Sequence, residues 1–418
     1  MKFKSSFLAE ASARGFFYQS TNLEAMDEHL TKKGRYGYIG FDITAKSLHV
    51  GHFIPIVMMR LFQKHGHRPV ILVGGGTTKI GDPSFRNTAR PVLSDEEIAE
   101  NIVGIKSCLN PFLRFGNGES DALMVNNVDW LDKIQYIPFL RDIGKYFSIN
   151  RMIGFDSVKS KLEENSTLSF SEFNYMILQA YDFLELYQNL GCYIQFGGQD
   201  QWGNIVCGVE LIKKKLGKEV FGFTNPLLTT SDGKKMGKTA NGAVWLSKDM
   251  LSAYDFWQYW RNVDDADVIK LMYLFSDLEL SEIKKMESIQ GKELNEIKKL
   301  LADKVTSIVH GKDSLEAIHR SASGIFDGSD SDLSKLTSIP KYSVSKSEIE
   351  SVSVIDILVN SSLCESRGDA KRLLRSGGIY INDKVIDENH GFLQSDFSKD
   401  NFIKLSCGKK KHLLIILD

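Results

Sequence analysis

The stretch YGYIGFDITAKSLHVGHFIPIVMMRLFQKHGHRPVILVGGG, residues 36–76, decides the fold class of the chain. Its apolar run at 36–43 predicts a buried strand, and the amphipathic pattern at 48–66 predicts a helix. The β-branched run at 69–76 predicts a second buried strand. A strand, a crossover helix and a strand form a βαβ unit, so we expect a parallel sheet with ligands at the carboxyl ends of its strands.

The pattern changes twice along the rest of the chain. Two more strand candidates, DALMVNN at 121–127 and CYIQFGG at 192–198, are separated by helical stretches. From about 251 to 319 the pattern is purely helical, which predicts a second domain. A Ser-, Asp- and Gly-rich segment at 321–347 predicts a tether, and a helix, helix, strand pattern follows it.

Length and composition limit the function classes. At 418 residues the chain exceeds the length at which one hydrophobic core keeps growing, so we expect two or three domains. The formal net charge of -1 gives no bulk basicity, so a nucleic-acid partner would have to meet local basic patches. The five cysteines are scattered without a C-x-x-C pair, which indicates a reducing cytosol and neither a disulfide framework nor a zinc knuckle. No apolar run approaches the roughly 18 residues of a membrane span, and the N-terminus lacks the hydrophobic core of a signal peptide.

His49 and His52 stand three residues apart around Gly51, after the first predicted strand. In a helix they share a face, and the first helical turn favours an anion such as a phosphate through its unpaired N–H groups. Gly51 would let a flat ring approach that turn closely. The alternative is two partly exposed histidines on an amphipathic helix, and a metal pair would need further ligands that the neighbouring sequence does not supply.

The glycine-rich stretch GGGTTKIGDPSFRNTAR, residues 74–90, follows the second predicted strand. Its glycines would let a ligand touch the backbone, and Lys79, Arg86 and Arg90 could meet phosphates. The stretch fits neither nucleotide-binding fingerprint, since Asp82 follows Gly81 where a P-loop requires lysine. A tight turn without a ligand is the alternative.

Lysines gather in SDGKKMGKT, residues 231–239. Lys234, Lys235 and Lys238 stand on a Gly-bounded loop, and lysines on flexible stems can approach developing phosphate charge and withdraw. The pattern suits a mobile catalytic loop, with a solvated surface loop as the alternative.

FNYMILQAYDFLEL, residues 173–186, predicts a helix with one polar stripe. Tyr175, Gln179 and Asp182 fall at i, i+4 and i+7, whereas nearly all other positions are apolar. The helix is therefore buried, and its polar groups must find partners. These partners are either an internal hydrogen-bond network or a polar ligand such as an amino acid.

Polar residues also follow a strand in QFGGQDQWGN, residues 195–204. Gln199, Asp200, Gln201 and Asn204 come at the carboxyl edge of the predicted sheet, where α/β folds bind ligands, although a solvated turn would have the same composition. Together, the five clusters indicate a ligand with phosphates, a ribose and an amino-acid-sized polar group.

The ordered set of motifs resembles that of bacterial and organellar tyrosyl-tRNA synthetases, which are class I enzymes. HVGH resembles the family's HIGH motif and KMGKT its KMSKS motif, and FDIT, GDPS, YMILQAYDF and GGQDQWGN occur in the family's order. The resemblance covers essentially the whole chain and implies an α/β fold. It implies a Rossmann-like parallel-sheet catalytic domain at 1–240, an α-helical anticodon-side domain at 241–325, a linker at 326–350 and a small α+β RNA-binding module at 351–418.

The reaction that the resemblance implies joins tyrosine to ATP, giving tyrosyl-adenylate and pyrophosphate, and then transfers tyrosine to the 3′ end of its tRNA. Charge develops on the phosphoryl oxygens, so such an enzyme acts by positioning and electrostatic stabilisation. The residues implied for catalysis are Thr44, His49, His52, Arg86, Arg90, Lys235, Lys238 and Thr239. The residues implied for ATP binding are Gly40, Asp42, Gly51, Asp200 and Lys238. Mg²⁺ is expected to arrive with ATP, and no metal site, zinc included, is expected in the protein.

The resemblance also assigns a tyrosine pocket. Tyr38 and Asp182 match residues that hydrogen-bond the substrate phenol, and phenylalanine would leave both without a partner. The residues matched to the α-ammonium group are Asp82, Tyr175 and Gln179. The residues matched to the carboxylate side and the ribose are Gln201 and Asp200.

Basic side chains on the last predicted helix resemble the RNA-contacting face of modules of the ribosomal protein S-four type. These residues are Arg367, Lys371, Arg372 and Arg375, and a further basic run, 409–411, follows near the end. Such side chains would position an RNA backbone without reading its sequence, whereas the interleaved acidic residues fit a merely solvated face. The family further implies a homodimer. The scattered cysteines predict a cytoplasmic location, and the lack of a long apolar run predicts no membrane partner.

Two residues depart from the family's pattern. Ile39 stands where many relatives carry a cysteine that touches the ribose, so the affinity for ATP could be lower. Ile43 replaces a proline, which is expected to loosen the turn before the histidines. Two other functions stay open. One is a related class I synthetase for tryptophan, which the pair Tyr38 and Asp182 disfavours, and the other is an RNA-binding descendant without catalytic activity, which the retained histidines and lysines disfavour.

Overall fold

The structure is a computed structural model of the chain. It describes residues 2–84, 93–164, 167–239, 242–326, 339, 341–345, 349, 352–361, 363–388, 390–393, 396–397, 401–408 and 411–417. The chain divides into two compact units. The first unit comprises Met1–Lys235 with Ile269–Ser288, and the second unit comprises Met236–Val268 with Ile289–Asp418.

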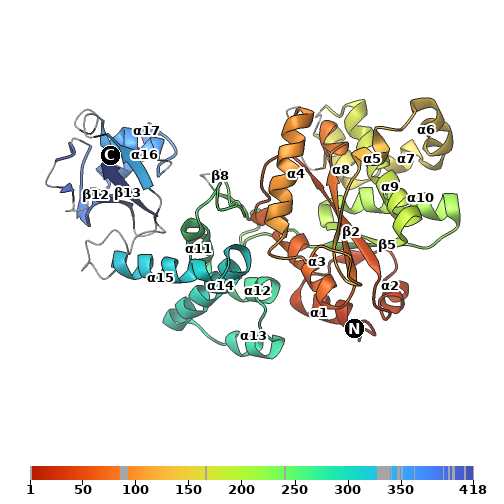
Figure 1. The fold of residues 1–418 in the computed structure, drawn as a ribbon, viewed down its shortest axis with the longest axis horizontal. Helices are drawn as coiled ribbons and strands as arrows, with labels where there is room; N and C mark the ends of the chain where they lie inside the picture. Colours follow the sequence, from red (N-terminus) through yellow and green to blue (C-terminus); the bar gives the residue numbers. More distant parts are fainter. Residues whose placement is uncertain are drawn as a thin grey trace. The chain divides into compact units, whose positions relative to one another are not determined.

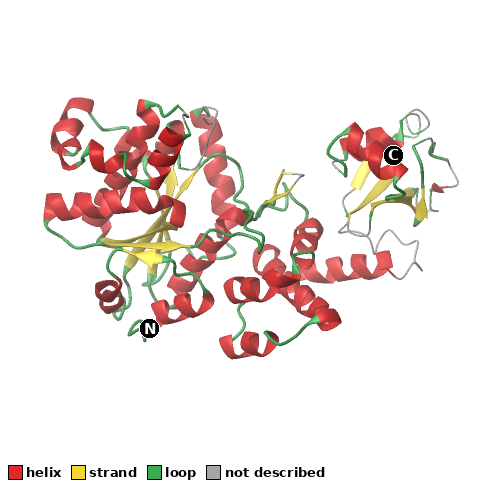
Figure 2. Ribbon diagram, turned by 180° about the vertical axis from the view of Figure 1, so that it is seen from behind, coloured by secondary structure: helices red, strands yellow, loops and turns green. Residues whose placement is uncertain are grey.

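The first unit is built on a six-stranded sheet with the strand order β1-β6-β5-β2-β3-β4. The strands are β1 (Gln19–Ser20), β2 (Tyr36–Asp42), β3 (Arg68–Gly74), β4 (Leu123–Asn126), β5 (Cys192–Gly198) and β6 (Phe221–Asn225). All neighbouring pairs are parallel except the antiparallel edge pair of β1 with β6. Helices lie on both sides of the sheet (Figure 1, Figure 2), so the predicted parallel α/β fold is confirmed.

Burial explains why β2 and β3 read as continuous apolar runs. Val70, Ile71 and Leu72 of β3 are almost wholly buried, because helices cover both faces of a parallel sheet. The crossover helix α3 (Phe53–Lys64) joins β2 to β3, as the sequence predicts, and nearly all of its apolar side chains are buried.

The other helices of the first unit start and stop at recognisable caps. Ser94 and Ser169 form capping boxes at the starts of α4 (Asp95–Leu109) and α9 (Phe170–Leu190), and Gly191 ends α9 at φ 64°. The remaining helices are α1 (Ser6–Arg14), α2 (Leu23–His29), α5 (Val128–Leu131), α6 (Tyr136–Asp142), α7 (Ile149–Met152), α8 (Asp156–Glu163), α10 (Trp202–Leu216) and α13 (Leu280–Met286), with α12 (Val268–Phe275) starting at the border of the unit.

Helices α12 and α13 belong to the first unit, although their sequence falls within the predicted helical domain at 241–325. The Phe275 ring lies 4.6 Å from that of Phe53, at the start of α3. The Arg14 guanidinium donates to the carbonyls of Tyr273, Ser276 and Leu278 at 3.2, 3.1 and 2.9 Å. These buried contacts link sequence-distant segments, and the periodicity of a helix carries no information about them.

The helical part of the second unit contains α11 (Ala253–Arg261), α14 (Leu294–His310) and α15 (Asp313–Phe326). Trp257 donates its indole N–H to Asp303 at 2.7 Å, which ties α11 to α14. The short strands β7 (Lys238–Thr239) and β8 (Gly242–Ala243) form an antiparallel pair before α11.

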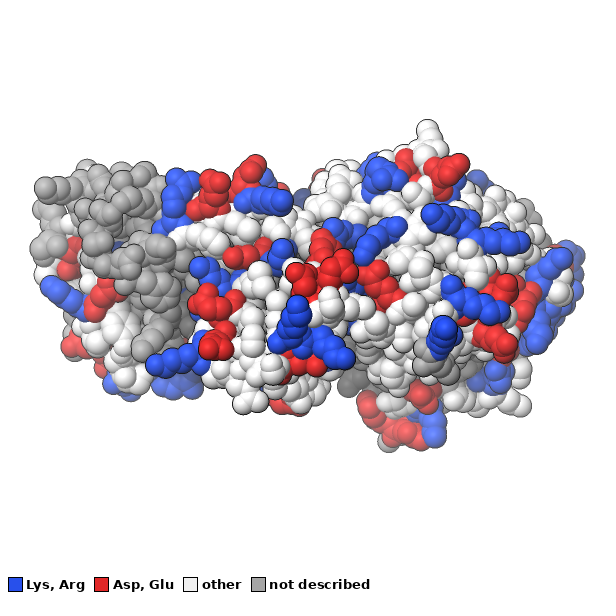
Figure 3. Space-filling model, turned by 90° about the horizontal axis from the view of Figure 1, so that it is seen from below, with Lys and Arg blue, Asp and Glu red and all other residues white. Residues whose placement is uncertain are grey.

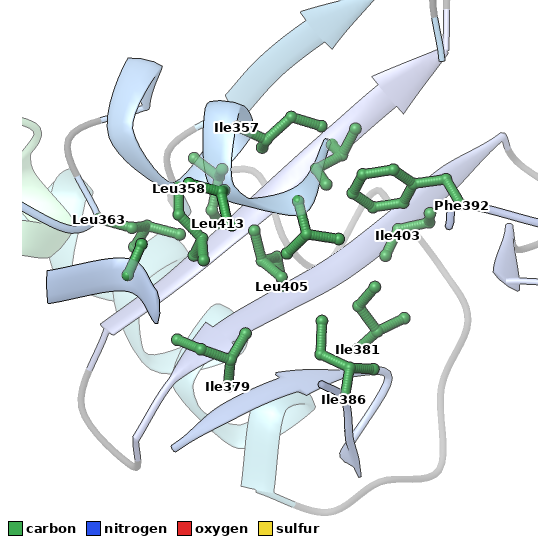
Figure 4. Close-up of a cluster of buried hydrophobic side chains, with 14 of the residues drawn as sticks. Ile357, Leu358, Leu363, Ile379, Ile381, Ile386, Phe392, Ile403, Leu405 and Leu413 are labelled. Carbon is green, nitrogen blue, oxygen red and sulfur yellow. The ribbon is translucent and has the colours of Figure 1, made fainter. Parts of the chain in front are cut away.

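The C-terminal part of the second unit is a five-stranded sheet with the order β11-β10-β12-β13-β9 and two helices. Its elements are β9 (Lys341–Val344), α16 (Val354–Asn360), α17 (Arg367–Arg375), β10 (Ile379–Ile381), β11 (Lys384–Val385), β12 (Phe402–Cys407) and β13 (Lys411–Leu417). Side chains from α16, β10, β12 and β13 point toward one another in one apolar core, with Ile357, Leu405 and Leu413 near its middle (Figure 4). The predicted helix, helix, strand order is confirmed.

The tether predicted at 321–347, and placed at 326–350 by the resemblance, lies mostly outside the described residues, and two described elements overlap it. Helix α15 continues to Phe326, and β9 pairs in parallel with β13. Val344 is buried and Tyr342 packs against the same core, so alternate side chains of β9 face inward. A strand of four residues, in which only Tyr342 and Val344 are apolar, gives too weak a pattern to predict from sequence. Among the described residues, no helix is long and apolar enough to cross a membrane.

Candidate functional site

Polar side chains gather at the carboxyl edge of the parallel sheet. Asp42 ends β2, Thr77 follows β3 and Asn127 follows β4. The residues Gln199–Gln201, which form a 3-10 turn, follow β5 directly. The carboxyl ends of parallel strands meet at one edge, so a single ligand there can touch residues from four separate loops.

One hydrogen-bond network centres on Asp42. Tyr175 donates its hydroxyl to Asp42 Oδ1 at 2.9 Å, and Thr77 Oγ1 donates to the same oxygen at 3.2 Å. The backbone N–H of Asp82 lies 3.4 Å from Asp42 Oδ2. Asn127 Nδ2 donates to Thr77 Oγ1 and to Asp182 Oδ2, both at 3.0 Å. The network therefore joins β2, the loops after β3 and β4, and α9.

A second network joins the loop after β5 to α9. Gln201 donates its amide to Asp82 Oδ2 at 2.7 Å. Asn204 donates to the side-chain carbonyls of Gln179 and Gln201, each at 3.1 Å. The structure thus brings Tyr175, Gln179 and Asp182 into internal hydrogen bonds, which was one of the two possibilities that the polar stripe left open.

Burial raises the pKa of Asp182 to about 7, although hydrogen bonds from Asn127 and Trp130 act in the opposite direction. The Trp130 indole N–H donates to Asp182 Oδ1 at 2.7 Å. Each carboxylate oxygen therefore already accepts one bond and has a further lone pair to offer.

Tyr38 lies on β2 and is 1% exposed. Its hydroxyl is buried and has no hydrogen-bond partner among the described residues. Burial, and then the nearby Asp182 carboxyl, raises the pKa of Tyr38 well above its usual value. A buried hydroxyl without a partner is costly, so this position is suited to a polar group from outside the protein.

Carboxyl groups give the site a negative character. Burial raises the pKa of Asp200, and the Asp82 charge adds to this effect. Burial also raises the pKa of Tyr175 well above its usual value, with Asp42 and Asp82 as the next causes. Several carboxyls in a partly buried space favour a positively charged group of the ligand.

The two histidines form a compact pair beside this edge. Their ring centroids lie 4.1 Å apart. His49 caps the 3-10 turn Val50–His52: its Nδ1 accepts from the N–H of Gly51 at 3.0 Å, and His52 Nδ1 accepts from the N–H of His49 at 3.3 Å. The expectation of both histidines in the first turn of an α-helix is wrong, because these side-chain caps hold the backbone in a tighter turn and α3 starts at Phe53.

The other residues matched to ATP fall into two groups. Gly40, Thr44 and Gly51 are exposed near the carboxyl end of β2. Lys235 is exposed at the end of the first unit, where its charge acts to lower the pKa of Asp200 against the larger effect of burial.

Four matched residues are not placed relative to this edge. Lys238 and Thr239 belong to the second unit, in β7. Arg86 and Arg90 lie outside the described residues. In the described part of the chain, no group of three or more His, Cys, Asp or Glu residues could hold a metal ion.

Asn127 and Trp130 both contact Asp182 but were not predicted as site residues. The stretch DALMVNN, which contains Asn127, was interpreted only as a strand. The two asparagines that end this predicted strand are the signal that could have identified Asn127, because the carboxyl end of a parallel strand lies at the ligand edge.

The departure at Ile43 has a structural account. Its N–H donates to Thr78 Oγ1 at 2.7 Å, and its side chain is fully buried. Proline lacks an N–H, so isoleucine gives the turn an anchor that proline could not provide.

The basic face of α17 is partly paired within the module. Arg367 forms an ion pair with Asp356, Arg372 with Asp369 at 2.6 Å and Arg375 with Glu388 at 3.3 Å. Lys371 is exposed. On the face of the molecule that Figure 3 shows, Lys and Arg side chains also lie next to Asp and Glu side chains. All these arginines are well exposed, so the pairs are weak and an RNA phosphate could displace the carboxylates.

Comparisons with known proteins agree over the whole chain. A family model described as tRNA synthetases class I (W and Y) matches residues 34–327, and one described as the tyrosine–tRNA ligase SYY-like C-terminal domain matches residues 333–415. The chain is 50% identical to a tyrosine–tRNA ligase of Wolbachia pipientis subsp. Culex pipiens, covering 100% of this chain and 99% of that one. It is also 50% identical to a tyrosine–tRNA ligase of Novosphingobium aromaticivorans, over 98% of each chain.

A solved structure supports the same relationship. The C-terminally truncated mitochondrial tyrosyl-tRNA synthetase of Aspergillus nidulans matches with a TM-score of 0.68 and 30% identity, over 77% of this chain and 94% of that one. The chain therefore belongs to the class I tRNA synthetases for tryptophan and tyrosine, among the tyrosine–tRNA ligases.

Proposed function

We propose that the protein is a tyrosine–tRNA ligase, which activates tyrosine with ATP and then transfers it to the 3′ end of its tRNA. The observation that carries the proposal is the buried hydroxyl of Tyr38 close to Asp182, for which the described part of the chain offers no hydrogen-bond partner. A substrate phenol can donate to the remaining lone pair of Asp182 and accept from Tyr38. Phenylalanine offers neither bond, so in its complex the Tyr38 hydroxyl would stay without this partner and Asp182 would keep only the bonds from Asn127 and Trp130.

The network around Asp42 and Asp82 is suited to bind the α-ammonium group of the amino acid. Asp82 and Tyr175 both bond to Asp42, and Gln179 is linked to Asp82 through Asn204 and Gln201. An α-ammonium group is cationic and carries three donors, so it suits an environment made of carboxylates and carbonyl oxygens. The hydrogen bonds among these side chains hold them in place before the substrate arrives, which reduces the loss of entropy on binding.

For the activation step, we assign the ATP phosphates to the His49 and His52 turn. The carboxylate of tyrosine attacks the α-phosphorus, and pyrophosphate leaves. Donors placed where charge develops on the phosphoryl oxygens lower the barrier without reorganising. The assigned donors are Thr44, His49, His52, Arg86, Arg90, Lys235, Lys238 and Thr239. Mg²⁺ is expected to accompany ATP, whose phosphate oxygens are hard ligands.

Gly40, Asp42, Gly51 and Asp200 complete the proposed ATP site on the ribose and backbone side. Gly40 and Gly51 have no side chain at exposed positions, so a nucleotide can approach the backbone there. Asp200 and Gln201 stand together after β5, which is the position from which a ribose hydroxyl can be bound.

The C-terminal module is assigned to tRNA through Arg367, Lys371, Arg372 and Arg375. A homodimer is supported by large apolar side chains that are exposed between residues 136 and 170, since such surfaces usually mark contacts with other proteins. These are Tyr136, Ile137, Leu140, Ile149, Ile153, Leu162 and Phe170. The cytoplasm is the proposed location, because all five cysteines are free thiols, as expected in a reducing compartment.

The test is exchange of labelled pyrophosphate into ATP, run in parallel with tyrosine, phenylalanine and tryptophan. We expect exchange with tyrosine alone. Exchange with tryptophan would identify the protein as the related tryptophan enzyme. Absence of exchange with all three amino acids, in protein shown to be folded, would identify an RNA-binding descendant and refute the proposal.

A further inference from the structure

Helix α4 presents one face to the loop 43–48, which connects β2 to the histidine turn. Asn101, Gly104 and Cys108 lie at i, i+3 and i+7, so they share this face. None of the three matches a family motif or touches the tyrosine network. Each of them nevertheless contacts the backbone or a buried hydroxyl of the loop.

Two of these contacts are polar and buried. Asn101 is 6% exposed, and its Nδ2 lies 3.4 Å from the carbonyl oxygen of Ile43. Cys108 Sγ lies 3.2 Å from Ser47 Oγ, which also donates to the carbonyl of Leu48 at 2.8 Å. The two ends of the loop are therefore tied to two successive turns of the same helix.

The contact between these two lies at Gly104, where the backbone of α4 approaches the backbone of Lys46. A Cβ atom built on Gly104 would lie 2.0 Å from the carbonyl oxygen of Lys46 and 2.9 Å from its carbonyl carbon. Both distances are too short for real atoms, so only glycine permits this approach. Glycine is otherwise unfavourable inside a helix, so local helix stability does not account for its presence at the tenth position of α4.

The far side of the loop is fixed as well. Thr78 Oγ1 accepts the N–H of Ile43 at 2.7 Å, while Asn101 contacts the carbonyl of the same residue. Ile43 is thus held at both of its backbone groups, directly before Thr44. An ion pair between Lys46 and Glu100 adds little, because both side chains are mostly exposed.

We propose that the Asn101, Gly104 and Cys108 face of α4 is a positioning surface for adenylate formation. It fixes the backbone position of the loop 43–48, and thereby the positions of Thr44 and His49 relative to the ATP phosphates. The inference rests on the proposed function, because it gives those two residues their task. Transition-state contacts are sensitive to shifts of about 1 Å, so a helix that fixes the loop backbone controls the rate without touching ATP.

The decisive variant is Gly104→Ala, in which one methyl group must push the Lys46 carbonyl away. We expect kcat/KM for ATP in pyrophosphate exchange to fall by about tenfold or more, whereas KM for tyrosine stays within about twofold, since the tyrosine pocket lies on other elements. Val103→Ala is the matched control: Val103 is the preceding residue of α4 and is 68% exposed, and we expect both parameters to be unchanged.

A second variant guards against a fold defect. Asn101→Ala adds no atoms and should lower kcat/KM for ATP by a smaller factor, with KM for tyrosine unchanged. Asn101→Asp, whose carboxylate cannot donate to the Ile43 carbonyl, should show the same loss as Asn101→Ala. Unchanged kinetics in Gly104→Ala, or equal losses for ATP and tyrosine in both variants, would overturn the proposal. If the unmodified protein itself shows no exchange, the proposed function fails instead, so the two failures are distinguishable.

Discussion

Replacing Tyr38 by phenylalanine should change stability and substrate binding in opposite directions. Removing a tyrosine hydroxyl usually deletes a hydrogen bond and destabilises a protein. Here the hydroxyl is buried and has no partner among the described residues, so the substrate-free protein carries its desolvation without compensation. Phenylalanine has the same ring and fits the same contacts, including the Phe183 ring whose centroid lies 5.3 Å away.

The magnitude follows from the state of that one hydroxyl. A buried polar group without a partner costs about 1–3 kcal/mol, so Tyr38→Phe should raise the free energy of unfolding by about that amount. Tyrosine binding relieves the same penalty, and the variant loses this gain. Affinity for tyrosine should therefore fall by roughly 5- to 150-fold, while phenylalanine binding stays nearly constant. The preference for tyrosine over phenylalanine narrows by the same factor.

The assay is chemical denaturation of the tyrosine-free protein, together with pyrophosphate exchange at varied tyrosine and phenylalanine concentrations. Tyr175→Phe is the control, because its hydroxyl donates to Asp42 at 2.9 Å and its removal should destabilise the protein. Two results would refute this account. One is a loss of stability in Tyr38→Phe like that in the control, and the other is an unchanged preference for tyrosine over phenylalanine in pyrophosphate exchange.

Two other outcomes test the assignments of Lys238 and of the C-terminal module, and a third tests the effect of a buried histidine on stability. Lys238→Ala should slow adenylate formation far more than it weakens tyrosine binding, and equal losses would remove it from the catalytic role. A chain ending at Phe326, ahead of β9, should activate tyrosine but charge tRNA poorly, and full charging would contradict an RNA role for the C-terminal module. Burial lowers the pKa of His67 to about 4 from 6.5, so the unfolded state gains a proton first and stability is lost as pH falls from about 6.5 to 4. The free energy of unfolding, measured with denaturant between pH 6.5 and 4, should fall less steeply with pH in His67→Phe than in the unmodified protein. Identical pH dependence in the two proteins would contradict this role of His67.

The parallel sheet could be predicted because strands buried on both faces require apolar residues at nearly every position. Strands β2 and β3 appear as nearly continuous apolar runs, β5 is apolar except for Gln195, and polar residues follow each of them. The polar stripe on α9 was equally informative, since Tyr175 and Asp182 stand among apolar neighbours and must find partners. Local patterns thus sufficed wherever a residue's role depended on its own element.

Contacts between distant segments left no such pattern. Trp130 meets Asp182 across 52 positions and Asn101 meets Ile43 across 58, and neither side chain stands out in its own stretch. The same reason explains β9, whose inward-facing residues gain meaning only when β13 lies beside it. The carboxylates that pair with the arginines of α17 were visible as acidic residues, but which of them pair depends on the fold.

Two positions in the first unit depart from the locally favoured choice. The Tyr38 hydroxyl finds no partner within the described ranges, whereas phenylalanine would need none. Gly104 interrupts a helix where alanine would be better by propensity. One faces the proposed tyrosine pocket, and the other supports the loop proposed to meet ATP. Nearby polar groups, by contrast, satisfy one another through Asp42 and Asp82 and need no substrate to stay ordered. Local rules therefore fail at places where the substrate, or the loop that positions it, supplies the compensation. A stabilising substitution at either position would be expected to reduce the activity that the departure serves.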